Sequence, residues 1–90
     1  MAHAGDGNLH PMVVFDASDA RSTARAIAAF EQVMDAALAL GGTITGEHGV
    51  GRLKRGALVR QLGPVAMEVH AWIKAGFDPD GILNPGNVLV

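Results

Sequence analysis

The chain has 90 residues, a formal net charge of −2 and no cysteine, with 49 % hydrophobic and only 4 % aromatic residues. This charge and the shortage of aromatic side chains argue against nucleic-acid binding, which relies on basic patches and stacking platforms. The absence of cysteine excludes disulfides and thiolate zinc sites. We therefore expect one small cytoplasmic domain without a membrane span, whose high apolar content is partly covered by something outside these 90 residues.

The first expected element is a hairpin within HAGDGNLH, residues 3–10. If Asp6 and Gly7 form a tight turn, Ala4 faces Leu9 and His3 faces His10, with Cβ atoms about 4.5 to 5.5 Å apart. Both imidazoles could then reach one metal ion. Short polar loops with histidine are ordinary, however, so the stretch could also be only a turn.

Before this hairpin the chain has no element that leads into His3, which is typical of a cut or truncated protein. Leu9–Phe15 is rich in Val and Phe and predicts a strand. Pro11 has no amide proton, so that end of the strand should lie at an edge, at the strand's beginning or beside a bulge.

A long helix should follow, capped by Asp16 or Ser18, with Asp19 in its first turn, and reaching about Leu40. Gly41-Gly42 supplies the stop. Its apolar face is predicted from residues spaced three and four apart, namely Ala20, Ala24, Ile27, Phe30, Met34 and Leu38.

The second half of the chain predicts a short strand at Thr43–Thr45, a glycine-rich loop GEHGVG, and a short basic helix over Leu53–Leu62 that ends at Gly63. Pro64 fits the first turn of another helix. Its apolar stripe would consist of Val65, Val69, Trp72 and Ile73, and we expect Met34 and Trp72 in the core. The tail, FDPDGILNPGNVLV, predicts turns.

Glu47 is the best third ligand for a metal held by His3 and His10, since two imidazoles and a carboxylate form a common open set for zinc, manganese or iron. His48 would point elsewhere if the backbone is extended, and could act on a substrate as a base. Asp6 and Asn8 are expected to form the turn. The glycines of GEHGVG could cradle phosphate, but the loop lacks the Walker lysine-serine pattern.

Three blocks, HAGDGNLHPMVVFDA, GGTITGEHGVGRLKR and AGFDPDGILNPGNVL, closely resemble in order and spacing the C-terminal end of FAD-linked oxidases of the vanillyl-alcohol-oxidase superfamily. The resemblance covers nearly the whole chain. Within this superfamily the chain most resembles the group that contains the FAD-linked D subunit of glycolate oxidase, with the D-lactate and D-2-hydroxyglutarate dehydrogenases as relatives.

The resemblance implies an enzyme that oxidises a 2-hydroxy acid to a 2-oxo acid, with hydride passing from the substrate's C2 to the flavin N5. It implies that His3, His10 and Glu47 hold a divalent metal such as zinc or manganese, and that His48 accepts the hydroxyl proton. Asn84 is implied to lie near the flavin.

The fold implied is α+β: residues 1–90 would be a C-terminal fragment of the ferredoxin-like substrate or cap domain, a small antiparallel sheet with helices on one side. FAD would be bound mainly by an upstream domain that is absent from these residues. The isolated chain is therefore expected to be catalytically inactive.

Two positions depart from the family's pattern. Asn87 stands where many relatives have a lysine, which puts any contact from that lysine in doubt. Met12 stands where the D-2-hydroxyglutarate enzymes have an asparagine, which favours a smaller substrate such as glycolate or D-lactate.

Two other hypotheses compete with this interpretation. One is a stand-alone metal-binding module, or a small metal hydrolase with Glu47 or His48 as base. The other is a structural module that associates with itself through apolar surface and an unpaired strand edge. The metal-binding module would require a monomeric fold. We expect the chain to dimerise, because its high apolar fraction and a strand without its upstream partner both leave contacts unmet.

Overall fold

The structure is a computed structural model that describes residues 1–89. In chain order it contains β1 (Ala2–His3), the short 3₁₀ turn η1 (Ala4–Asp6), β2 (Asn8–Leu9), α1 (Ala20–Ala39) and α2 (Arg55–Phe77). The described part of the chain is therefore mostly helical, with one two-stranded antiparallel sheet. Neither helix combines the length and apolarity that a bilayer span needs.

The hairpin forms, but its predicted register is wrong. Ala2 pairs with Leu9 and His3 pairs with Asn8, so His10 lies outside the two paired strands. The reason is the turn: Ala4–Asp6 form a 3₁₀ turn closed by a hydrogen bond from the Gly7 amide to the Ala4 carbonyl, 3.2 Å. Gly7 takes a left-handed conformation, φ 73°, which favours glycine, and the centre of the turn moves toward the N-terminus.

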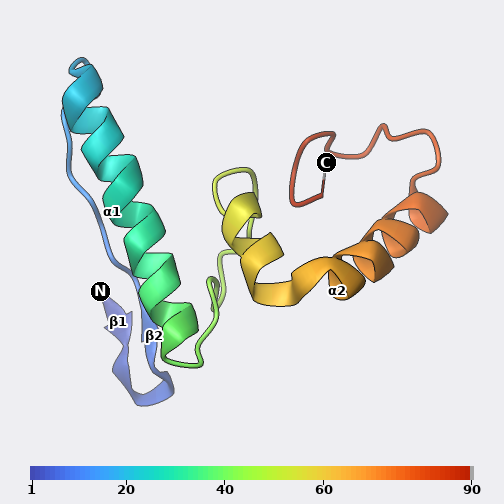
Figure 1. The fold of residues 1–90 in the computed structure, drawn as a ribbon, viewed down its shortest axis with the longest axis horizontal. Helices are drawn as coiled ribbons and strands as arrows, with labels where there is room; N and C mark the ends of the chain where they lie inside the picture. Colours follow the sequence, from blue (N-terminus) through green and yellow to red (C-terminus); the bar gives the residue numbers. More distant parts are fainter. Residues whose placement is uncertain (90) are drawn as a thin grey trace.

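The other two strand predictions are also wrong. Of Leu9–Phe15 only Leu9 belongs to a strand, and residues 10–16 run alongside α1 without forming a helix or strand (Figure 1). Thr43–Thr45 is a loop, because side chains satisfy its backbone: the Gln61 Oε1 atom accepts from the Ile44 amide at 3.1 Å, and Lys54 Nζ donates to the Ile44 carbonyl at 2.9 Å. A β-prone sequence needs a partner strand to form a ladder, and residues 1–89 supply none for these two segments.

The long helix is confirmed. α1 ends at Ala39, one residue before the predicted end near Leu40. Its N-cap is Asp19 instead of Asp16 or Ser18, because the Asp19 carboxylate accepts a hydrogen bond from the Arg21 amide at 2.9 Å. Asp16 instead accepts from the Ser18 hydroxyl and amide, and these hydrogen bonds lower the pKa of Asp16.

The predicted break between the two later helices is confirmed at Gly63. α2 is interrupted there by non-helical backbone, φ 74° and ψ 174°, directly before Pro64. Past this kink α2 diverges from α1 (Figure 1). As a result Trp72 is 65 % exposed, and its predicted place in the core is wrong because no other element of the described chain covers that face.

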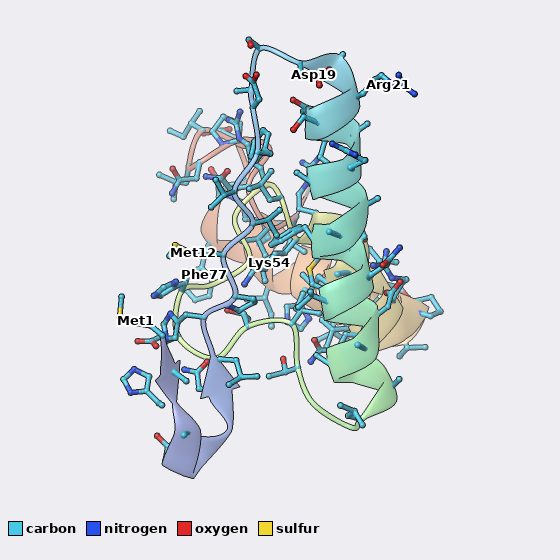
Figure 2. All side chains as sticks on the ribbon, turned by 90° about the vertical axis from the view of Figure 1, so that its left-hand side faces the viewer. Met1, Met12, Asp19, Arg21, Lys54 and Phe77 are labelled. Carbon is cyan, nitrogen blue, oxygen red and sulfur yellow. The ribbon has the colours of Figure 1, made fainter. Side chains whose placement is uncertain are left out.

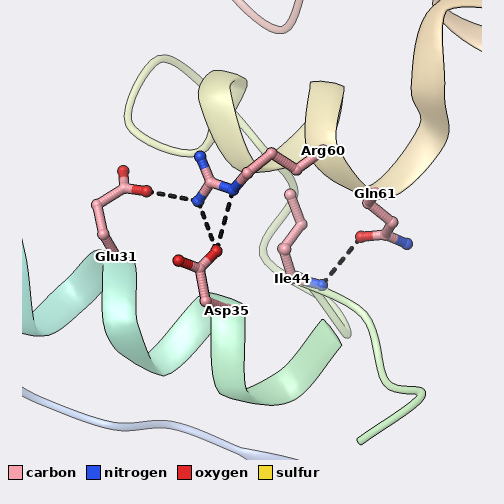
Figure 3. Close-up of polar contacts among 5 residues, drawn as sticks. All are labelled: Glu31, Asp35, Ile44, Arg60 and Gln61. Atoms are coloured by element: carbon pink, nitrogen blue, oxygen red, sulfur yellow. Dashed lines mark hydrogen bonds and ion pairs between the residues drawn. The ribbon is translucent and has the colours of Figure 1, made fainter. Parts of the chain in front are cut away.

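The core lies where the second half of α1 meets the first half of α2. Its buried members are Met34, Ile44, Ala57 and Leu58. Phe30 and Leu38 of the predicted α1 face pack against this cluster, whereas Ala20, Ala24 and Ile27 are exposed. Next to this core, Arg60 of α2 forms ion pairs with Glu31 and Asp35 of α1 (Figure 3).

The molecule is open for its size. Its radius of gyration is 15.2 Å, whereas a compact domain of this length has about 12 Å. Large apolar side chains are spread over its surface (Figure 2), among them Val14 at 95 % and Phe77 at 84 % exposure. The expected excess of uncovered apolar surface is therefore present.

Candidate metal centre

The hairpin and the loop after α1 bring three predicted residues together. His3 Nε2 lies 3.2 Å and His10 Nε2 lies 2.8 Å from the same oxygen, Oε1 of Glu47. The two imidazole centroids are 5.5 Å apart. His3, His10 and Glu47 each offer one ligand atom within 4.8 Å of the others, so the predicted set of donors converges despite the shifted register.

Local backbone explains why the histidines still meet. The His10 amide donates to the Met1 carbonyl at 2.9 Å, which continues the hairpin beyond the paired strands and keeps His10 beside His3. Glu47 lies on the loop after α1, and Ile44 anchors that loop in the core. The site is thus assembled from two segments about forty positions apart in the sequence.

The loop that carries Glu47 is also tied to the tail. The Val88 amide donates to the Gly51 carbonyl at 2.8 Å. Arg52 donates to Asn87 Oδ1 at 3.1 Å, and Arg55 donates to the Gly86 carbonyl at 2.7 Å. Asn87, which the sequence marked as a departure from the family, is therefore the acceptor for an arginine side chain.

The donor set fits a divalent cation. Two imidazole nitrogens and a carboxylate oxygen suit zinc, manganese or iron. A tetrahedral zinc ion with bonds of about 2.0 to 2.1 Å holds its ligand atoms about 3.3 Å apart, close to the 3.2 Å between His3 Nε2 and Glu47 Oε1. His3 and Glu47 remain 59 % and 44 % exposed, which leaves an open side for a further ligand.

His48 lies beside this cluster and outside it. Its ring centroid is 4.9 Å from that of His10, with the two planes at 69°. His48 is exposed and is not one of the three converging donors. An exposed imidazole next to a metal-type cluster can exchange a proton with a small molecule held there.

Asn84 is not brought to the cluster. It lies in the tail after α2 with a left-handed backbone, φ 46°, and Figure 1 shows this tail on the opposite side of the view from the hairpin. Within residues 1–89 no hydrogen bond joins Asn84 to His3, His10 or Glu47.

Sequence reasoning missed Asn8. It was expected to form the turn, but it lies in β2 and its Nδ2 donates to Glu47 Oε1 at 3.1 Å. Its position two residues before a candidate ligand was the available signal. Without the register, however, the side chain could not be assigned to either face of the hairpin.

Comparison with known proteins identifies relatives over nearly the full chain. The family described as "FAD linked oxidases, C-terminal domain" matches residues 1–88. The chain is 45 % identical over 87 residues to a probable mitochondrial D-lactate dehydrogenase of Danio rerio, covering 97 % of this chain and 18 % of the relative. It is 43 % identical over 84 residues to the glycolate oxidase subunit GlcD of Escherichia coli K12, covering 93 % of this chain and 17 % of that subunit.

A third relative is the mitochondrial D-lactate dehydrogenase [cytochrome] of Arabidopsis thaliana, which is 40 % identical over 89 residues, covering 99 % of this chain and 16 % of the relative. The chain thus spans less than one fifth of the length of these curated relatives.

Proposed function

Since this chain belongs to the family of C-terminal domains of FAD-linked oxidases, we propose that it works as the C-terminal part of a longer flavoenzyme that oxidises a small 2-hydroxy acid. Relatives named as glycolate oxidase subunits and D-lactate dehydrogenases support glycolate or D-lactate as the substrate. In this proposal residues 1–90 are one domain fragment, and the domain that binds most of the FAD lies outside them.

One observation carries the proposal: His3, His10 and Glu47 each place a ligand atom within 4.8 Å of the others. These three side chains would hold a divalent metal, which supplies Lewis acidity toward the hydroxyl and carboxylate oxygens of a 2-hydroxy acid. Oxidation of the alcohol would remove a hydride from C2, and FAD would supply the hydride acceptor in the complete enzyme. The chain's own residues then have to orient the substrate and take its proton.

His48 is the residue we propose for the proton. It stands next to His10 and is exposed, so a hydroxyl held at the cluster would lie within reach of an imidazole nitrogen. The uncharged form of the ring would accept the hydroxyl proton as the hydride leaves C2. Asn84 is proposed to lie near the flavin once the upstream domain is in place.

The small sheet would extend into the ferredoxin-like sheet of the complete substrate domain. The segment over residues 10–16 supports this, since it is β-prone in sequence but has no strand partner in residues 1–89. Met12 is 84 % exposed in that segment, and we propose that it favours a small substrate. A cytoplasmic location is likewise a proposal.

Metal titration tests directly whether His3, His10 and Glu47 form one site. Titration of the purified chain with Co²⁺ or Zn²⁺ should show one site, and His3→Ala, His10→Ala or Glu47→Gln should each weaken binding at least tenfold, since each removes one of three ligands. His70→Ala is the matched control, because His70 lies on α2 and bonds the Ala66 carbonyl. Unchanged affinity in the Glu47 or His10 variant would contradict the proposed centre.

Turnover tests the proposed division of labour between this chain and the rest of the flavoenzyme. Added to FAD, glycolate and a dye acceptor, the isolated chain should reduce no dye, because it lacks the domain proposed to bind the flavin. In the complete flavoenzyme, His48→Gln should keep the metal and lose turnover. Robust dye reduction by the 90-residue chain would contradict this division of labour.

A self-associating structural module remains the second candidate, favoured by the exposed face of α2 after Gly63. Val65, Trp72 and Phe77 are 74 %, 65 % and 84 % exposed on that helix. A continuous apolar helix face normally lies against another element. In the longer enzyme the upstream chain would cover it, and in the isolated chain a second copy would.

A further inference from the structure

Asn8 is the polar side chain that links the hairpin to Glu47. It is half-buried in β2, and its Nδ2 lies 3.1 Å from Glu47 Oε1. The same oxygen faces the nitrogens of both His3 and His10. The Asn8 amide therefore bonds the carboxylate oxygen on which the two imidazoles converge.

Gly46 makes room for this contact. A Cβ at position 46 would lie 2.6 Å from Asn8 Oδ1, 2.7 Å from Asn8 Cγ and 2.9 Å from Asn8 Nδ2. Real side chains do not approach so closely, and all three nearest atoms belong to Asn8. The φ angle of Gly46 lies outside the left-handed region, unlike that of Gly49, so Gly46 is required for space and not for its backbone conformation.

We propose that Asn8 is a positioning residue: packed flat against Gly46, its carboxamide holds the Glu47 carboxylate between the two imidazoles. The inference deepens the proposed function, since it rests on Glu47 serving as a metal ligand. An amide suits this place because it donates to the carboxylate without adding a charge. Groups that orient a metal ligand in this way typically change metal affinity 10- to 100-fold when they are removed.

The first test measures Co²⁺ affinity of the chain by titration of its visible absorption. Asn8→Ala removes the carboxamide, and Asn8→Leu keeps its bulk but removes the donor. Both should weaken Co²⁺ binding about 10- to 100-fold. Gln32→Ala is the control, since it removes a carboxamide from an exposed position of α1, and it should bind as the wild type does. Affinities within twofold of wild type in both Asn8 variants would overturn the proposal.

A double-mutant cycle tests the role of Gly46. Gly46→Ala should weaken Co²⁺ binding in the wild type, because the new methyl group displaces the Asn8 carboxamide. In the Asn8→Ala background the same substitution should cost nothing further, since the three nearest atoms have been removed. Gly76→Ala, where an added Cβ meets nothing within 4 Å, is the control. An equal cost of Gly46→Ala in both backgrounds would refute the packing argument.

NMR of the metal-free chain distinguishes failure of this inference from failure of the proposed function. Wild type and Gln32→Ala should show nuclear Overhauser contacts between the Glu47 methylene protons and the His10 ring, and Asn8→Ala should lose them. If wild type binds no Co²⁺, the metal function fails, while these contacts still decide the role of Asn8. Their persistence in Asn8→Ala would overturn it.

Discussion

Ile44 joins the core to the candidate metal centre, and its truncation gives the sharpest test of that connection. Its side chain is 6 % exposed and packs with Met34, Ala57 and Leu58. Its amide and carbonyl are held by Gln61 and Lys54 (Figure 3 shows the first contact). Three residues later comes Glu47. The core therefore fixes the start of the loop that presents the carboxylate.

Ile44→Ala removes three buried carbon atoms. At about 0.8 kcal/mol for each buried methylene, the lost transfer free energy is about 2.5 kcal/mol, and any cavity left behind adds to it. For a domain of this size the melting temperature should fall by about 10 to 20 °C. Thermal unfolding followed by circular dichroism at 222 nm measures this shift.

Ile82→Ala is the matched control because Ile82 is also in a loop but is 74 % exposed. It should destabilise the chain by less than about 0.7 kcal/mol, since only about a quarter of the side chain is covered. If Ile44→Ala melts within 3 °C of Ile82→Ala, the small cluster around Met34 does not hold the two helices together. The account of how Glu47 is positioned would then be wrong as well.

Three further predictions concern charge and association. Arg60→Ala should lower the melting temperature slightly at low salt and less in 1 M NaCl, because its pairs with Glu31 and Asp35 are partly exposed; an equal loss at both salt concentrations would argue against an ionic contribution. The hydrogen bond from Lys74, with backbone amides of residues 82 and 83, lowers the pKa of Asp78 against the opposing effect of burial. A lowered carboxyl pKa stabilises the fold above the ordinary aspartate pKa of about 3.8, and that stability is lost as pH falls through the folded pKa. Urea unfolding between pH 2 and 6 should therefore show a smaller acid-induced loss in Asp78→Asn than in wild type, and identical pH profiles would contradict this role. Sedimentation should show wild type self-associating and Trp72→Lys shifted toward monomer; a strictly monomeric wild type at high concentration would exclude self-association through this face.

Elements held together by local forces could be read from the sequence. The spacing of Phe30, Met34 and Leu38 and the stop at Gly41-Gly42 predicted α1, because a helix satisfies its backbone from its own neighbours. Gly63 before Pro64 predicted the break in α2, because glycine at a helix end and proline in a first turn act through the local backbone. Strands at 9–15 and 43–45 could not be judged in this way, since a strand depends on a partner that the described chain does not supply.

The candidate centre also has a part that the sequence predicted and a part that only the tertiary structure decided. The residue types in HAGDGNLH and GEHG indicated the donors His3, His10 and Glu47 and the neighbouring His48, because imidazoles and carboxylates carry their chemistry wherever they stand. Tertiary structure decided the hairpin register, the approach of Glu47 to both histidines, and the contact of Asn8 with Glu47 across Gly46. Those features depend on the turn geometry and on the anchoring of Ile44 in the core, which bring together segments far apart in the chain.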